Sequence, residues 1–227
     1  MPNISLLHRD IKLPNDITIK LRKSQKAKRI ILKVKKDYGE LVIPKRVSIK
    51  SAINFAKLKQ DWLSEKLASQ HTVSFKEGAK IRIFEREYKI IYSDQISKGV
   101  SIEGDKLIYG SKKFSELRIK RFLARLLKER IITIADDMIL KLRVNYQTIT
   151  IREMSTRLGS CSSTGRISFS LKLIFMTEFV LKYVVAHEIS HLVEMNHSKN
   201  FWLLVGKLFP DWKIAKKWLK ENGQVVL

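Results

Sequence analysis

The 227-residue chain has a single cysteine, Cys161, and therefore cannot form an intramolecular disulfide. This scarcity is typical of proteins in a reducing compartment. No apolar run approaches the ~20 residues that a membrane-spanning helix requires. The first residues also lack the basic and then apolar layout of a signal peptide. From these absences we expect a soluble, cytoplasmic protein that has no membrane partner.

Acidic residues are also scarce, with 22 Asp and Glu against 45 Lys and Arg, and the formal net charge is +23. A surface of this sign attracts nucleic acid, anionic lipid or acidic proteins. The basic residues are spread along the chain, and most of the excess is lysine, which also serves simply to keep a surface solvated. Non-specific nucleic-acid contact and a merely solvated surface are therefore both open, and the oligomeric state is not indicated.

Histidine is rare, yet three of the five histidines fall within residues 187–197. His187 and His191 are four apart in the pattern HExxH, so on a helix they share a face and can reach one metal ion. Glu188 is then placed to act as the general base for a zinc-activated water. The flanking residues are mostly apolar, so we expect a buried helix. The alternative is an amphipathic helix whose histidines only bond to their neighbours.

His197, six residues beyond His191, is the favoured third ligand. A turn at Asn196 is expected to swing it back, because asparagine tolerates the left-handed conformation that often ends helices. Glu194 is the competing ligand, still on the expected helix, but imidazole suits zinc better. Three protein ligands with an open fourth position are typical of a catalytic zinc site. We expect one Zn²⁺ per chain.

The first half is predicted to be rich in β-strands, with one long helix over 49–69 that Ser48 caps. A hairpin turn is expected at 37–40. The expected strands are 17–21, 30–34, 41–43, 80–83, 87–92, 100–102 and 107–109.

The second half is predicted to contain a long helix over 116–143, a small sheet, the HExxH helix from about 177 and a final helix to about 221. The sheet is built from strands 147–152 and 166–173. This order is that of a zincin peptidase, in which residues 166–173 would form the edge strand to which a substrate peptide adds. The fold class is α+β. We expect a β-rich N-terminal subdomain over 1–112 and a zincin-like subdomain over 113–227.

The segment AHEISHLVEMNHSKNFW, with GSCSS upstream and PDWKIAKKWLKENG downstream, resembles the YgjP-like metallopeptidase domain, a bacterial group related to small gluzincin and SprT/Wss-type peptidases. The resemblance covers nearly the whole chain and is most specific over about 150–223. It implies zinc bound by His187, His191 and His197, with Glu188 as catalytic acid and base. One departure is Leu158, which stands where the family usually has Trp before Gly-Ser-Cys.

The favoured hypothesis is a zinc metallopeptidase of the metalloendopeptidase type, acting on a peptide or protein substrate. The alternative is a basic, nucleic-acid-associated protein whose zinc site trims DNA-bound proteins or is catalytically silent. A purely structural zinc domain is less favoured, because such a site has no use for Glu188. Cys161 is expected to be a small buried residue and not a ligand. Asn196, Tyr183 and Arg157 are the candidates for stabilising the oxyanion.

Overall fold

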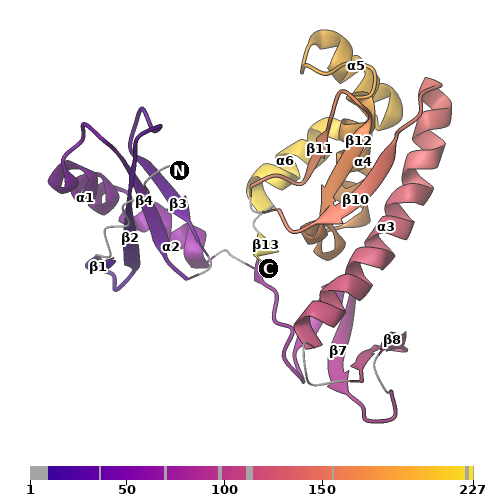
Figure 1. Cartoon of the computed structure of the whole chain (residues 1–227), viewed down its shortest axis with the longest axis horizontal. Helices are drawn as coiled ribbons and strands as arrows, with labels where there is room; N and C mark the ends of the chain where they lie inside the picture. The colour runs from indigo at the N-terminus through magenta and orange to yellow at the C-terminus, as the bar shows by residue number, and fades with distance from the viewer. Residues whose placement is uncertain are drawn as a thin grey trace. The chain divides into compact units, whose positions relative to one another are not determined.

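The computed structural model describes residues 10–35, 37–68, 71–96, 99–110, 115–154, 156–222 and 225–226. Helices and small mixed sheets confirm the α+β class. The chain divides into two compact units, Met1–Thr72 as unit 1 and Val73–Val225 as unit 2 (Figure 1). The boundary expected between residues 112 and 113 falls inside unit 2, because the strands before it share a core with the helices after it. No helix in these described ranges is both long and apolar enough to span a membrane.

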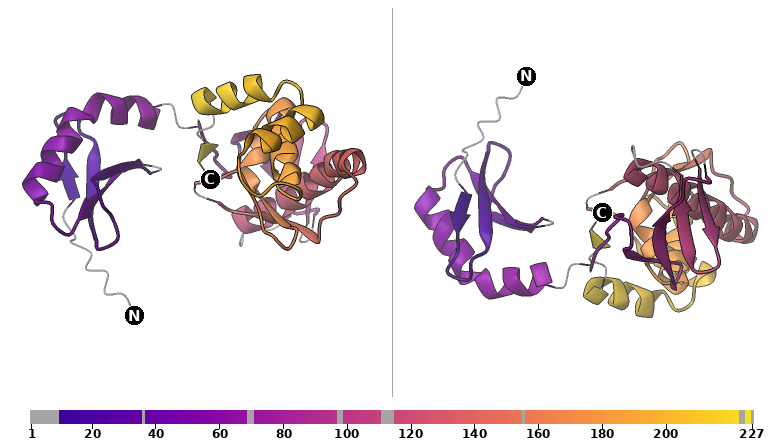
Figure 2. Two further views of the ribbon diagram at one scale, coloured as in Figure 1. Left: turned by 90° about the horizontal axis from the view of Figure 1, so that it is seen from above. Right: turned by 90° about the horizontal axis from the view of Figure 1, so that it is seen from below.

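Unit 1 is a four-stranded sheet, of order β1-β2-β4-β3, with two helices on one face (Figure 2). The predicted hairpin is confirmed as the antiparallel β3–β4 pair, and β2 runs parallel to β4. The elements are β1 (Asp10–Lys12), β2 (Thr18–Ser24), β3 (Ile31–Val34), β4 (Gly39–Pro44), α1 (Ile49–Leu58), α2 (Gln60–Ala68) and β5 (His71–Thr72).

The helix predicted over 49–69 is interrupted near its middle. Ser48 caps it as expected, by accepting a hydrogen bond from the Ser51 N–H at 3.1 Å. However, α1 ends at Leu58 and α2 starts at Gln60. Between them, the Lys59 N–H donates hydrogen bonds to the carbonyls of Ala56 and Lys57. Neither glycine nor proline marks this break, and the apolar periodicity continues across it. The sequence therefore predicted one continuous helix.

Unit 2 combines two small sheets with four long helical segments and one short one. Helix α3 runs beside β10 and α4 (Figure 1). The elements are β6 (Lys80–Ile83), β7 (Arg86–Tyr92), β8 (Val100–Glu103), β9 (Lys106–Tyr109), α3 (Ser115–Leu142), β10 (Thr148–Arg152), β11 (Gly159–Cys161), β12 (Arg166–Ser170), the 3₁₀ helix η1 (Leu171–Phe175), α4 (Glu178–Ser190), α5 (Lys199–Leu208) and α6 (Trp212–Asn222); β13 (Val225–Val226) ends the described chain.

Strand β12 lies in the middle of its sheet, parallel to β10 and antiparallel to β11. The prediction that residues 166–173 form an edge strand is therefore wrong, and residues 171–175 form η1 instead. Ile167 and Phe169 are fully buried, as suits a central strand. The strand order β10-β12-β11 was not predicted because β11 is only three residues long and is followed by serines, which are typical of turns. The edge strand next to α4 is β11.

The β6–β7 hairpin fixes the start of α4. Its two turn residues, Phe84 and Glu85, both have positive φ, at 45° and 73°. Non-glycine residues adopt this conformation only when their surroundings require it. Here the Phe84 N–H donates to the Ile174 carbonyl at 3.0 Å, and Glu85 accepts from the Glu178 N–H at 3.4 Å. The tip of the hairpin thus anchors the helix that carries the HExxH pattern.

Candidate metal centre

Helix α4 carries His187 and Glu188 and begins where predicted. Thr177 caps it by accepting a hydrogen bond from the Val180 N–H at 3.3 Å. Arg130 of α3 and Lys182 form ion pairs with Glu178, whose negative charge also suits the N-terminal end of a helix. The helix is buried along most of its length, as expected from its apolar flanks. Two polar residues, Glu188 and Ser190, are among its buried ones.

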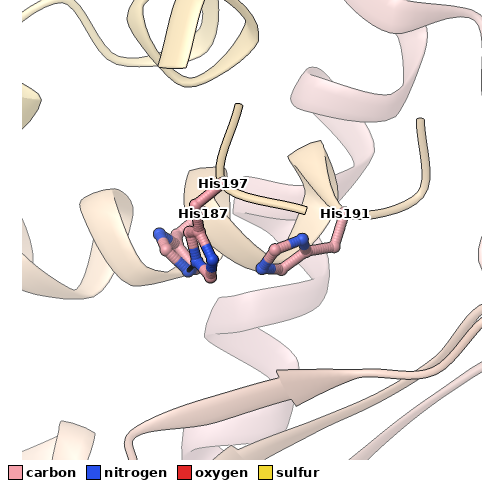
Figure 3. A group of neighbouring side chains, drawn as sticks. All are labelled: His187, His191 and His197. Carbon is pink, nitrogen blue, oxygen red and sulfur yellow. Dashed lines mark hydrogen bonds between the residues drawn. The ribbon is translucent and has the colours of Figure 1, made fainter. Parts of the chain in front are cut away.

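The side chains of His187, His191 and His197 converge (Figure 3). One candidate ligand atom from each lies within 4.8 Å of those of the other two, and the Nε2 atoms of His187 and His197 are 3.1 Å apart. Nitrogens bound to one zinc ion at ~2.0–2.1 Å and tetrahedral angles would be about 3.4 Å apart. The His187–His197 distance is close to this value, and the third nitrogen is near enough for the three rings to hold one metal ion.

His197 reaches this position through a sharp chain reversal after α4. The helix ends at Ser190, with His191 as its C-cap. The prediction that a left-handed Asn196 makes the turn is wrong, because Asn196 is not among the positive-φ residues. Its side-chain oxygen instead accepts a hydrogen bond from the Ser198 N–H at 2.9 Å, and Ser198 caps α5. The chain around His197 is thus shaped by a hydrogen bond of the Asn196 side chain, and not by a left-handed backbone conformation at Asn196.

His191 is held in one tautomer by the chain itself. Its Nδ1 lies 3.0 Å from the carbonyl oxygen of Glu194, which accepts a hydrogen bond, so Nδ1 carries the proton. Nε2 therefore keeps its lone pair for a metal ion. Glu194 was expected on the helix but lies beyond its end. In the described part of the chain, the cluster of candidate ligand atoms contains the three histidines and not the Glu194 carboxylate.

The His187 and His191 rings are uncharged at neutral pH. Burial, helped by His191, His197 and Lys216, lowers the pKa of His187 to about 4. Burial also lowers the pKa of His191. The Nδ1 atom of His187 is buried without a hydrogen-bond partner in the described ranges, unlike that of a core histidine bonded to its neighbours. Neutral imidazole is the form that binds metal, so the donor set fits a zinc-like ion.

Glu188 projects from α4 against the backbone of β11. Its side chain is 5 % exposed, and burial raises its pKa to about 8, opposed by the charge of Arg157. A Cβ atom on Gly159 would lie 2.6 Å from Cγ and 2.7 Å from Cδ of Glu188, closer than real Cβ atoms approach. Glycine at 159 therefore leaves the room that Glu188 occupies. A lone glycine in a strand is the available sequence signal for such a close approach, but Gly159 lies outside the strands predicted from the sequence.

The other predicted residues differ in their surroundings. Cys161 is partly buried, and burial together with Glu188 raises its thiol pKa to about 11, so it is protonated and a poor ligand at neutral pH. Tyr183 is 6 % exposed, and its ring centroid lies 6.1 Å from that of His187. Asn196 and Arg157 are exposed. The candidates for oxyanion stabilisation thus separate into one core residue and two accessible ones.

An aromatic wall beside the histidines was not predicted. Phe201 is fully buried, and its ring stacks on His191 with centroids 4.5 Å apart. The Trp202 ring lies 5.9 Å from those of both His187 and His197, and stacks on Trp212 at 4.4 Å. The sequence feature that could have indicated this wall is the adjacent pair Phe201 and Trp202, at the start of the helix that follows His197.

A helix-borne histidine pair joined by a third converging histidine is a metal-binding arrangement. Residues 28–222 match the family model described as YgjP-like, metallopeptidase domain, so the chain belongs to the YgjP-like metallopeptidase family. Among solved structures it is similar to the metallopeptidase zymogens abylysin of Pyrococcus abyssi and jannalysin of Methanocaldococcus jannaschii, each at 20 % identity. The abylysin match has a TM-score of 0.38 and covers 43 % of this chain and 99 % of that one. The jannalysin match has a TM-score of 0.36 and covers 40 % and 94 %. The search of curated proteins returns no significant match.

Proposed function

We propose that this chain is a zinc-dependent metallopeptidase that hydrolyses peptide bonds, with one zinc ion held by His187, His191 and His197. The observation that carries the proposal is the convergence of three histidine nitrogens beside a buried glutamate. Three protein ligands leave a coordination position open, which a catalytic zinc requires. Membership of a metallopeptidase family supports peptides or proteins as substrates.

Glu188 is proposed as the general base. When bound, zinc would polarise the scissile carbonyl and lower the pKa of water toward ~7. The Glu188 carboxylate takes a proton from the attacking water as the new C–O bond forms, and returns it to the amine nitrogen as the C–N bond breaks. Burial, opposed by the charge of Arg157, raises the pKa of Glu188 to about 8, and a divalent cation nearby would favour the carboxylate. These opposed influences keep both protonation states accessible near neutral pH.

We propose that an extended substrate adds to β11, in place of the strand first expected. In the described part of the sheet, β11 is an edge, paired on one side only. It also packs against α4, and its Gly159 lies against Glu188. A peptide paired with this edge would have its backbone held by main-chain hydrogen bonds. The scissile bond would thereby lie close to the general base.

The test is a cleavage screen in which new N-termini are identified by mass spectrometry. The purified protein, loaded with zinc, is incubated with a denatured protein mixture, and a parallel sample is treated with a chelator. We expect cleavage that the chelator abolishes and added zinc restores. Cleavage that continues unchanged without metal would contradict the proposed mechanism.

A second candidate function, nucleic-acid binding, is favoured by the net charge of +23. Exposed cations follow one face of α3 at Arg121, Arg125 and Lys128. In this function the metal centre would act on proteins bound to DNA, or would be catalytically silent. Duplex DNA binding that weakens steeply with salt would support it. No binding at ~50 mM salt would exclude it.

A further inference from the structure

We propose that Trp202, Trp212, Lys213 and Lys216 form a subsite that binds a carboxylate group of the substrate. We call these four residues the indole–lysine subsite. The inference rests on the proposed peptidase function and adds a substrate class to it. The favoured substrates are peptides with a negative charge a few residues from the bond that is cut.

The two indole rings form a platform attached to the histidine cluster. Trp202 of α5 and Trp212 of α6 stack with centroids 4.4 Å apart and planes inclined by 21°. Both side chains are only partly buried, so they are not simply core residues. The Trp202 ring lies 5.9 Å from the His187 and His197 rings. The platform therefore continues from the metal ligands toward solvent.

The ammonium group of Lys216 lies over this platform. Its Nζ lies 4.1 Å from the Trp202 ring centroid and 5.7 Å from that of Trp212, and Lys213 lies 5.7 Å from Trp212. Lys216 is exposed, and within the described ranges no carboxylate forms an ion pair with it. Cation–π contact restrains a side chain that otherwise samples many rotamers. A pre-positioned cation binds an anion at a lower entropic cost.

The spacing relates this cation to the proposed cleavage site. The path from the His187 ring through Trp202 to the Lys216 ammonium is short enough for roughly three extended residues, at ~3.3–3.6 Å each, to span it. An acidic side chain, or the C-terminal carboxylate of a short peptide, reaches Lys216 from there. Both sources present the same chemical group.

General positive charge is the rival explanation. Helix α6 carries further exposed lysines, including Lys217 and Lys220. A diffuse field would attract any anion without regard to Lys216. Lys217 adjoins Lys216, so its replacement removes the same charge from the same helix. Unlike Lys216, Lys217 makes no cation–π contact in the described ranges. Lys217→Met is therefore the matched control.

The experiment measures peptide binding by fluorescence anisotropy to zinc-loaded protein carrying Glu188→Gln, which prevents turnover. Three pools of fluorescein-labelled octapeptides, randomised among neutral residues, serve as probes. The first has one glutamate and an amidated end, the second has glutamine in its place, and the third is the glutamine pool with a free C-terminal carboxylate. Lys216→Met and Lys217→Met are compared in this background, and the same pools are offered to the wild type for cleavage.

We expect the glutamate pool or the free-carboxylate pool to bind about fivefold tighter than the neutral pool. Lys216→Met should remove this preference and Lys217→Met should keep it. The pool that shows the preference identifies the source of the carboxylate. Equal binding of all pools, or equal loss in both variants, would overturn the subsite. A preference that depends on Lys216 without cleavage of any pool would retain the subsite and count against the peptidase function.

Discussion

The two units of this chain place helices against sheets of the same kind but differ in what they bury. Each has a sheet with one parallel pair, β2 with β4 in unit 1 and β10 with β12 in unit 2, and a third strand antiparallel to one of them. Of the described residues, the buried polar and charged ones are Ser170, Glu188, Ser190 and His191, all in unit 2. Burying such groups costs free energy unless they are paired or bound. Ser170 and Ser190 are hydrogen-bonded, so unit 2 differs from unit 1 in burying Glu188 and His191, and a bound metal ion would offset the cost of burying these two groups.

The largest predicted effect is on turnover. Glu188→Gln keeps the shape of the side chain and removes the base, so we expect cleavage to fall about 10³-fold. Bound zinc should be unchanged, because Glu188 is not a proposed ligand. Steady-state kinetics with metal analysis checks this, and Glu194→Gln is the control that should cleave as the wild type does. A Glu188→Gln protein as fast as the wild type would end the general-base assignment.

Removal of metal should destabilise unit 2 and leave the stability of unit 1 unchanged. We expect zinc at about a thousand times its Kd to stabilise unit 2 by about 4 kcal/mol, since only the folded site binds it. Unit 1 has no share in the histidine cluster. Hydrogen exchange with and without a chelator should therefore show faster exchange in α4 and no change in β2 or β4. Equal acceleration in both units would mean that the buried polar groups of unit 2 are not stabilised by metal.

A smaller loss is expected from Gly159→Ala. The added Cβ would meet the Glu188 side chain and displace it, because a flexible side chain yields before the backbone does. A shift of about 1 Å in a catalytic group can cost roughly 10²-fold in rate. We expect kcat to fall while KM and metal content hold. Gly99→Ala is the matched control, since its Cβ would meet its nearest neighbour at an ordinary 3.5 Å. Equal kcat in both variants would remove the positioning role of Gly159.

Two of the proposed metal ligands could be paired from the sequence, because helix periodicity alone relates His187 to His191. His197 was inferred from reach, and the structure brings it to the other two histidines by a route that differs from the predicted one. The hairpin at 37–40 and the cap at Ser48 were predicted correctly, since both depend on local chemistry.

Long-range arrangements were harder to predict. The central place of β12 depends on the three-residue β11, which has too little sequence to show a period. The contact between Gly159 and Glu188 joins residues far apart in the chain. Stacking of Trp202 on Trp212 likewise depends on how two helices pack. Such pairings are set by tertiary packing and leave only weak local signals.

The smallest effect concerns the anchor of α4. Burial alone would raise the pKa of Glu178, but the hydrogen bonds and charges of Lys182 and Arg130 hold it below its ordinary value. A carboxylate with a lowered pKa stabilises the fold above its unfolded pKa of ~4.3, and this contribution is lost as pH falls through the folded value. Glu178→Gln should cost up to about 1 kcal/mol at pH 7 and less near pH 3, measured by urea unfolding.

Glu40→Gln provides the counterpart in unit 1, where Arg22 lies 3.1 Å from Glu40. We expect its effect to be confined to unit 1 and to leave cleavage unchanged. A loss for Glu178→Gln that is the same at both pH values would show that the ion pairs are not its cause.

The most direct test of the account is the metal content of the purified wild type, His197→Ala and Glu194→Ala, each measured by elemental analysis after exposure to equimolar zinc and removal of unbound metal. We predict one zinc per chain in the wild type and in Glu194→Ala, and little or none in His197→Ala. A folded wild type that binds no zinc, or a site that survives His197→Ala and fails in Glu194→Ala, would contradict the three-histidine centre.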